Sequence, residues 1–211
     1  MLTNINDLDL TKTYTYADYL TWRFKERVEL IMGKVFKMTP APSRTHQQVS
    51  SRLHVAIGNI LKGTNCEIYS APFDVRLAIN TKGEGIGNTV VQPDLCVICD
   101  KTKLDERGCN GAPELVVEIL SPSTASKDLK EKYNVYEKGG VKEYWTIDPI
   151  DGIISIYVLN NKGEFTFRKP YTVEDSLESQ TISGLMINLK DVFPQLLEES
   201  QEPYGSEEKR I

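Results

Sequence analysis

The sequence has no run of 18 or more apolar residues, so it predicts no segment that could span a membrane. Its first residues, "MLTNINDLDLTKTY", lack the basic start and the apolar core of a signal peptide. Only four of the 211 residues are cysteines. So few cysteines, without an export signal, predict a reducing cytoplasmic location rather than a disulfide framework.

The sequence also lacks two features that are typical of proteins that bind phosphate groups. The Gly-rich segment 80–89 has no Gly-Lys-Ser/Thr ending and joins no strand to a helix, so it does not predict a phosphate-binding loop. Basic residues are not in excess, because the formal net charge is −5. However, residues 198–211 hold five acids and two bases, and residues 123–142 hold five lysines against three acids. A local basic surface therefore fits the sequence, and net charge does not exclude nucleic acid as a partner.

The chain is long enough for one domain with a sizeable core, and its composition is that of an ordinary globular protein. Short apolar runs and helical periodicities alternate along it and predict a mixed α/β (α+β) fold. Three successive strand patterns between residues 143 and 168 predict a C-terminal β-meander. We expect a single domain over residues 1–197, followed by an acidic, disordered tail at 198–211.

Several local elements follow from capping and turn residues. In the first half of the chain we expect a helix after Thr15, a tight hairpin at Met32–Gly33, and a helix that begins at Ser43 or Thr45 and ends at Gly63. Further along, we expect a strand over residues 89–100, with Pro93 and Asp94 within it, and a helix from about Ala125 to Lys138.

The stretch "PELVVEILS" has the short, β-branched pattern of a buried strand, yet Glu118 lies in its middle. Side chains alternate across a strand, so Glu118 shares one face with Val116 and Leu120. Burying an ionised carboxylate without a partner costs on the order of several kcal/mol. Either a structural lysine or a functional cation must therefore compensate Glu118.

Asp94 lies in a second apolar strand, directly after Pro93. Proline removes a backbone donor, so the strand is expected to be irregular there, and Asp94 is either a turn residue or a carboxylate that faces a cleft. Two acids from neighbouring strands can share a divalent cation, which takes oxygen ligands.

Lys132 is the lysine of the 125–138 helix that faces inward. At 100° per residue it falls within the apolar arc of Leu129, Tyr133 and Tyr136, whereas Lys130 falls on the polar face. Two interpretations remain open. Lys132 forms a structural pair with Asp128, one turn earlier, or its ammonium group is directed at a carboxylate site.

At these residues the sequence resembles a known family. The segments "QPDLCVICD", "GAPELVVEILSPSTASKDLKEKYNVYEKGGVKEYWTID" and "YTYADYL…VELIMGKV" resemble the Uma-two family of the PD-(D/E)XK nuclease superfamily, in order from about Tyr14 to Phe193. The resemblance implies a restriction-endonuclease-like core, with a central mixed β-sheet flanked by helices. It places the first acid of the superfamily at Asp94 and the second at Glu118. The superfamily's lysine normally stands two residues after the glutamate, where this chain has Leu120 instead.

Lys132 is the candidate for the displaced lysine, since related families carry it on the neighbouring helix. The resemblance implies hydrolysis of DNA with Mg²⁺, for which Mn²⁺ could substitute, held by Asp94, Glu118 and the backbone carbonyl of Ile119. A homodimer is expected, because two copies reach both DNA strands. Supporting roles are expected for a further set of residues: Glu29, His46, Asp74 and Asp128. For His46, a histidine at a helix start without a catalytic role remains the alternative.

Three other functions compete with this hypothesis. Cys96 and Cys99 form a C-x-x-C pair that could bind zinc with Cys109 or a histidine, or serve redox chemistry. Residues three apart on a strand face opposite sides, however, and a redox pair is expected at a helix N-terminus. A glycosidase would use two carboxylates and no metal. A nuclease-like module that binds DNA or protein without catalysis is favoured by Leu120 in the lysine position.

Overall fold

The computed structural model describes residues 2–38, 41–79, 88–122 and 125–193. Most of the Gly-rich segment 80–89 and the whole predicted tail at 198–211 lie outside the described residues. The single domain over residues 1–197 and the disordered tail therefore stay predictions.

One large sheet lies at the centre of the molecule. Its strand order is β12-β11-β10-β9-β6-β3, and only the neighbours β9 and β10 run parallel. These strands are β3 (Glu67–Ser70), β6 (Leu95–Ile98), β9 (Leu115–Ile119), β10 (Glu143–Asp148), β11 (Ile153–Leu159) and β12 (Phe165–Phe167). Strands β10 to β12 form the predicted meander.

A second six-stranded sheet has the order β2-β1-β5-β4-β8-β7. Its strands are β1 (Val28–Ile31), β2 (Lys34–Lys37), β4 (Val75–Leu77), β5 (Thr89–Val91), β7 (Leu104–Asp105) and β8 (Gly108–Asn110). The predicted hairpin joins β1 to β2, and positive φ angles at Met32 and Gly33 make its tight turn. A two-stranded sheet pairs β13 (Ser176–Glu178) with β14 (Met186–Asn188).

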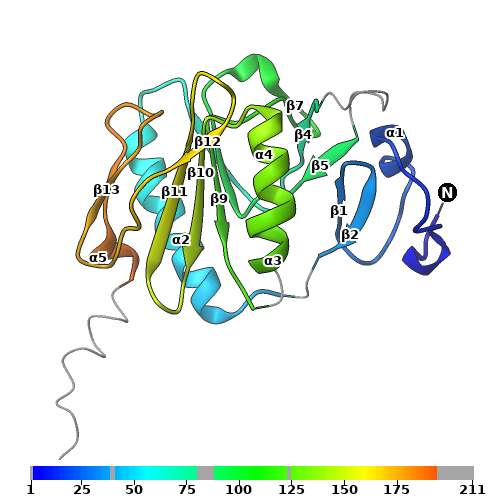
Figure 1. Cartoon of the computed structure of the whole chain (residues 1–211), viewed down its shortest axis with the longest axis horizontal. Helices are drawn as coiled ribbons and strands as arrows, with labels where there is room; N and C mark the ends of the chain where they lie inside the picture. Colours follow the sequence, from blue (N-terminus) through cyan, green and yellow to red (C-terminus); the bar gives the residue numbers. More distant parts are fainter. Residues whose placement is uncertain (1, 39–40, 80–87, 123–124, 194–211) are drawn as a thin grey trace, which may run out of the picture.

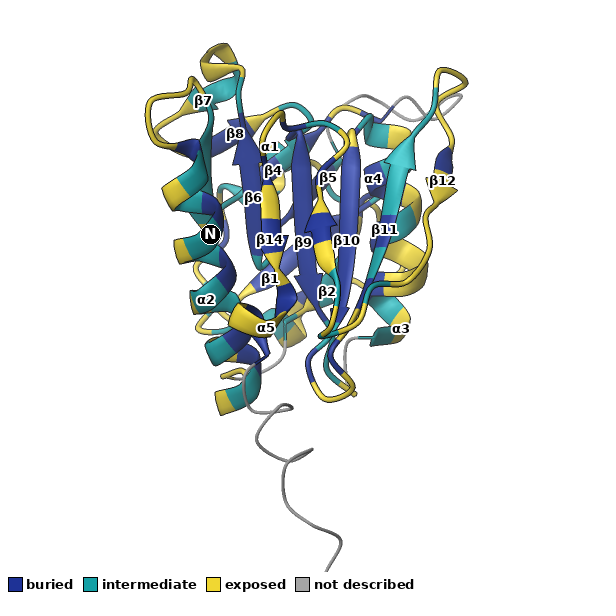
Figure 2. Cartoon of the chain, turned by 90° about the vertical axis from the view of Figure 1, so that its left-hand side faces the viewer, coloured by how far each residue is buried: buried dark blue, intermediate teal, exposed yellow. Residues whose placement is uncertain are grey.

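Helices cover both faces of the central sheet. Helix α2 (Arg44–Leu61) and the short helix α5 (Leu189–Val192) pack on one face, against alternate residues of β6, β9, β10 and β11. Helix α4 (Tyr133–Gly139) and strands of the second sheet cover the other face (Figure 1). Strands β9 and β10 are consequently buried along their length (Figure 2). The predicted mixed α/β fold, with a central mixed sheet flanked by helices, is confirmed.

The remaining helical segments are short. They are η1 (Ile5–Asp7), α1 (Tyr16–Tyr19), η2 (Lys101–Lys103), α3 (Ala125–Lys127) and η3 (Asp128–Lys132). Thr15 caps α1 as predicted, through a reciprocal capping box with Asp18. Ser43, the first of the two candidates, caps α2 by accepting a hydrogen bond from the backbone N–H of His46.

The expectation of one strand over residues 89–100 was wrong, whereas the expected helix from Ala125 is present with an irregular middle. Residues 89–100 form two strands in different sheets rather than one strand, because the ladder breaks at Gln92, Pro93 and Asp94. The helix from Ala125 does reach Gly139, but its middle, η3, is a π-helical turn. Leu129, expected to face the core, is 43% exposed.

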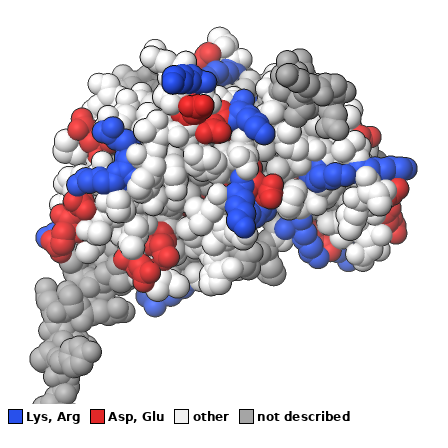
Figure 3. All heavy atoms as spheres, in the orientation of Figure 1, with Lys and Arg blue, Asp and Glu red and all other residues white. Residues whose placement is uncertain are grey.

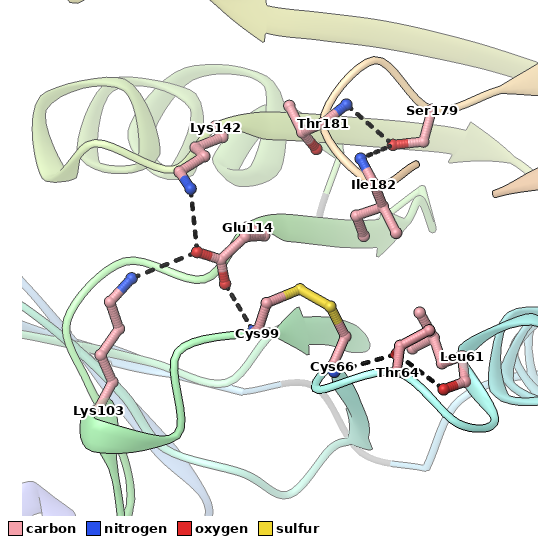
Figure 4. The surroundings of a disulfide bond; sticks show 10 residues. All are labelled: Leu61, Thr64, Cys66, Cys99, Lys103, Glu114, Lys142, Ser179, Thr181 and Ile182. Atoms are coloured by element: carbon pink, nitrogen blue, oxygen red, sulfur yellow. Dashed lines mark hydrogen bonds and ion pairs between the residues drawn. A yellow bond between two sulfur atoms is a disulfide. The ribbon is translucent and has the colours of Figure 1, made fainter. Parts of the chain in front are cut away.

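The structure also contains a disulfide bond, between Cys66 and Cys99 (Figure 4). Strands β3 and β6 are antiparallel with Glu67 opposite Ile98, so the next pair outward is formed by these two cysteines. The expectation of unpaired cysteines is therefore wrong for Cys66 and Cys99, while Cys96 and Cys109 are free and buried. The sequence could not reveal the pair, because it depends on the register of strands 33 residues apart.

We expect removal of this disulfide bond, by Cys66→Ala with Cys99→Ala, to lower the free energy of unfolding by about 3–4 kcal/mol. The reason is that a cross-link over a loop of this length restricts the unfolded chain. Urea denaturation with and without reductant measures the effect. The double variant also serves as the control for the reductant, because reductant should shift only the wild-type denaturation curve. Equal denaturation curves for both proteins under oxidising conditions would contradict the prediction.

Candidate active site

The predicted site residues meet at one end of the central sheet. Strand β9 ends there at Ile119, β6 begins there after Asp94, and α2 begins there after Ser43. Strands β6 and β9 are antiparallel neighbours with Leu95 opposite Val117, so Asp94 comes close to the end of β9. The chain enters α3 soon afterwards, beside the same end of the sheet (Figure 1).

Glu118 and Lys132 form the buried centre of this cluster. The Nζ atom of Lys132 donates to Oε1 of Glu118 at 2.8 Å, and both side chains are almost fully buried. The Tyr136 hydroxyl donates to the same Oε1 atom at 2.6 Å. The compensating partner that Glu118 requires is therefore the lysine that helical periodicity selected.

Glu29, on β1, links this centre to a second lysine. Its Oε1 atom lies 2.9 Å from Lys132 Nζ, and its Oε2 atom lies 2.6 Å from Lys127 Nζ. Asp128 also contacts Lys132, with its Oδ1 atom 3.7 Å from Nζ. Lys132 thus contacts three carboxylates, and its predicted pairing with Asp128 is one contact among these.

Asp94 is held at the edge of the cluster. Its Oδ2 atom accepts a hydrogen bond from the backbone N–H of Ile119 at 2.8 Å and lies 3.2 Å from Nε2 of His46. The side chain of Asp94 is 22% exposed, whereas that of Glu118 is 4% exposed. Asp94 therefore faces the solvent while Glu118 lies deeper.

Asp74 is not part of this centre. It accepts hydrogen bonds from the Gln92 side chain at 2.8 Å and from the Tyr19 hydroxyl at 3.2 Å. The connection to the centre runs through Gln92, whose backbone N–H donates to Glu29 at 2.9 Å. Of the four residues with predicted supporting roles, Glu29 and Asp128 contact Lys132, His46 contacts Asp94, and Asp74 is linked to Glu29 only through Gln92.

Burial and charge crowding control the protonation of the site. Burial raises the pKa of Glu118 well above its usual value, Lys132 opposes this, and the negative charges of Asp128, Asp94 and Glu29 raise it further. Burial alone would lower the pKa of Lys132, but Glu118, Glu29 and Asp128 raise it well above its usual value. The ammonium group therefore stays charged among the carboxylates.

Neighbouring charges also shift the pKa values of His46 and Glu29. Burial tends to lower the pKa of His46, but its hydrogen bond to Asp94 and the negative charges of Asp94 and Asp128 raise it overall. For Glu29, burial alone would raise the pKa, but the two lysines lower it overall. Glu29 is consequently an ionised group even though it has no exposed surface.

The π-helical turn η3 brings Asp128 and Lys132 to the same buried side of the helix. Such turns occur mostly as single wide turns and often lie at functional sites. The Tyr144 hydroxyl donates to the backbone oxygen of Asp128 at 3.0 Å, which ties the wide turn to β10.

Three residues of this cluster were not predicted as site residues: Lys127, Tyr136 and Gln92. Tyr136 lies four residues after Lys132, so the helical period could have selected it. Lys127 and Gln92 gave no such signal, because their contacts depend on how β1 and β5 are placed against the helix.

The donor set of the site, two carboxylates, is compatible with a divalent cation. Among the described residues there is no group of three or more His, Cys, Asp or Glu side chains arranged to hold a metal. Mg²⁺ needs fewer protein ligands, since it keeps several waters and is often bound by one or two carboxylates plus substrate phosphate. Asp94 and Glu118 can supply two carboxylates, and the negative charges that crowd Glu118 favour a cation.

The C-x-x-C pair is not arranged for zinc. Cys99 is joined to Cys66, while Cys96 is fully buried in the core beneath α4 and the second sheet. Burial also raises the pKa of Cys96 above the range in which a thiolate forms at neutral pH.

The fold is a central mixed sheet flanked by helices, with Glu118 on β9 and Asp94 directly before the neighbouring strand β6. One solved structure with this fold is a "putative nuclease belonging to DUF820" from Anabaena variabilis, with a TM-score of 0.63 and 22% identity, covering 87% of this chain and 99% of that one. An uncharacterised protein of Synechocystis sp. is 29% identical over 168 residues, which are 78% of this chain and 84% of the relative.

The model of the Uma2 family, described as "Putative restriction endonuclease", matches residues 16–190. The chain therefore belongs to the Uma2 family, and the family identification made from the sequence is confirmed. Membership in this family supports a nuclease function, which means hydrolysis of nucleic acid. In the part of the chain that the structure describes, no helix is long and apolar enough to cross a membrane.

Proposed function

We propose that the protein is a metal-dependent endonuclease that hydrolyses phosphodiester bonds of DNA. The observation that carries this proposal is the contact of Lys132 with Glu118 at 2.8 Å, directly beside Asp94, which is bonded to the backbone of Ile119. This is the acid, acid and lysine set of the superfamily, with the lysine supplied by the helix instead of position 120.

Each residue has a distinct task in the proposed reaction. Asp94, Glu118 and the carbonyl of Ile119 would hold Mg²⁺, or Mn²⁺ as a substitute. When bound, the ion polarises the phosphate and lowers the pKa of a coordinated water. Lys132 opposes the rise in the pKa of Glu118 and offers positive charge beside the reacting group.

The surrounding residues orient this set. Glu29 and Asp128 fix the ammonium group of Lys132 from two further sides. His46 holds Asp94 Oδ2 in place, and Asp74 supports Glu29 through Gln92.

Two further properties are part of the proposal. We expect a homodimer, so that both DNA strands are cut by a symmetric pair. We also expect the protein to act in the cytoplasm, although the Cys66–Cys99 disulfide bond removes the argument that rested on unpaired cysteines.

Nicking of a supercoiled plasmid tests the function. We expect the wild-type protein to nick in Mg²⁺ or Mn²⁺, to stop when EDTA is added, and to resume when metal is restored. Glu118→Gln should reduce nicking by a factor of a hundred or more, as expected for loss of a metal-holding carboxylate.

Glu114→Gln is the matched control. Glu114 is also a buried glutamate, but it lies before β9 and contacts Lys103, Lys142 and the backbone N–H of Cys99 (Figure 4). Its loss should reduce stability and leave specific activity unchanged. Nicking that is insensitive to EDTA, or equal in both variants, would contradict the proposed reaction.

One observation favours the second candidate, a nuclease-like module without catalysis. Lys132 already contacts three carboxylates, which is also what a purely structural lysine would do. A wild-type protein that binds plasmid in Mg²⁺ or Mn²⁺ without cutting it would establish this module in place of the endonuclease.

A further inference from the structure

The two lysines that share Glu29 differ in accessibility. The side chain of Lys132 is 3% exposed and contacts Glu118, Glu29 and Asp128. The side chain of Lys127 is 17% exposed, and its Nζ atom lies 2.6 Å from Oε2 of Glu29. Both belong to the continuous helical segment that follows β9, but only Lys127 comes from its first turn, at the edge of the site.

A phosphate group could not use Lys132 as its contact without a large rearrangement. Removing the ammonium group from its carboxylates would leave buried negative charges without compensation, which is strongly destabilising. Lys127 is different, because an ammonium group has three N–H donors and this one lies partly in the solvent. One donor can stay on Glu29 while the others contact a phosphate oxygen.

The acidic surroundings favour such a contact. Glu29, Asp94, Glu118 and Asp128 place four carboxylates around the two lysines, so without a metal ion an incoming phosphodiester meets acidic side chains at this site. On the face seen in Figure 3, the basic and acidic side chains of the described residues are interspersed. Lys127 offers positive charge at the edge of this cluster, where its partly exposed side chain is accessible to a phosphate.

We propose that Lys127 contacts a phosphate of the DNA backbone at the active site and that Glu29 positions its ammonium group for this contact. Lys132 remains the internal cation that holds Glu118. This inference rests on the proposed function for its substrate, but it assigns the substrate contact to a residue outside the acid, acid and lysine set.

The test measures how DNA affinity depends on salt. Each phosphate contact by a cation contributes about one unit to the slope of log K against log salt concentration for duplex DNA. The probe is a labelled DNA duplex. Its binding to the wild type and to Lys127→Gln is measured in EDTA at KCl concentrations between 50 and 200 mM. Glutamine retains an N–H donor for Glu29, so the fold is preserved while the charge is lost. We expect the slope to fall by about one unit.

Two variants complete the design. Lys127→Arg should keep the wild-type slope, since the charge is retained. Lys130→Gln is the matched control, because Lys130 is an exposed lysine on the same helical segment, and its slope should equal that of the wild type. In the nicking assay, Lys127→Gln should raise KM at least tenfold, while kcat changes less.

The outcomes separate this inference from the proposed function. An unchanged slope for Lys127→Gln, an equal fall for Lys130→Gln, or a wild-type protein that binds no duplex would overturn the role of Lys127. A wild-type protein that binds with the expected slope and loses one unit in Lys127→Gln, yet cuts no plasmid in Mg²⁺, would uphold the contact and overturn the endonuclease.

Discussion

Replacing Lys132 by methionine is expected to lower the free energy of unfolding by about 3–5 kcal/mol near pH 8, the usual cost of removing one partner from a buried ion pair. The variant keeps most of the side-chain volume, so the loss reports charge rather than packing. Glu118 would remain buried with Tyr136 as its hydrogen-bond donor, but without the positive charge 2.8 Å from its Oε1 atom.

The loss should depend on pH in a defined direction. Without Lys132, burial and the negative charges of neighbouring carboxylates raise the pKa of Glu118 further than in the wild type. The folded variant then binds a proton that the unfolded chain releases above the ordinary glutamate pKa. Its stability consequently falls as pH rises, by at most about 1.4 kcal/mol per pH unit until the folded-state pKa is reached. Relative to the wild type, the variant is expected to be least impaired near pH 5.

Urea denaturation at pH 5 and pH 8 measures both effects. Glu118→Gln combined with Lys132→Met should recover part of the stability, since an amide needs no counter-charge. Lys138→Met is the control, because Lys138 lies exposed on the same helical segment. If Lys132→Met were as stable as Lys138→Met at pH 8, Lys132 would not be the cation that compensates Glu118.

The central pair could be predicted from the sequence because it depends on local periods. Alternation along β9 placed Glu118 with Val116, and Val116 does belong to the core that α4 covers. The helical period placed Lys132 inward in the same way. Leu129 shows the limit of this reasoning, because the wide turn of η3 changes the residue spacing and leaves Leu129 in the solvent.

Contacts between distant segments could not be predicted in this way. Proline at position 93 indicated an irregular strand, but not that β5 and β6 belong to different sheets. The contact of Lys127 with Glu29 joins residues 98 positions apart, and it exists only because the second sheet packs beside α3 and α4. The family resemblance identified Glu29 as a candidate site residue. Its contact with Lys127 could be found only from the structure.

Asp94→Asn is expected to abolish both binding of Mn²⁺ and plasmid nicking, with a loss of a thousandfold or more in rate. An asparagine side chain can keep one oxygen near the backbone N–H of Ile119, so the local structure should be retained. It loses the negative charge, however, and hard divalent cations prefer carboxylate oxygens. Calorimetric titration with Mn²⁺ and the nicking assay, carried out on the same preparation, measure the two effects.

The other end of β6 provides a matched control for this variant. Asp94 precedes β6, and Asp100 follows it, where its side chain accepts hydrogen bonds from Thr102. Asp100→Asn removes the same charge from the same strand without touching the cluster, so Mn²⁺ binding and nicking should be unchanged. If Asp94→Asn still bound Mn²⁺ with wild-type affinity, the ion would have to be held by other carboxylates of the cluster. That result would contradict the assignment of Asp94 as a metal ligand, and with it the proposed site of Asp94, Glu118 and the Ile119 carbonyl.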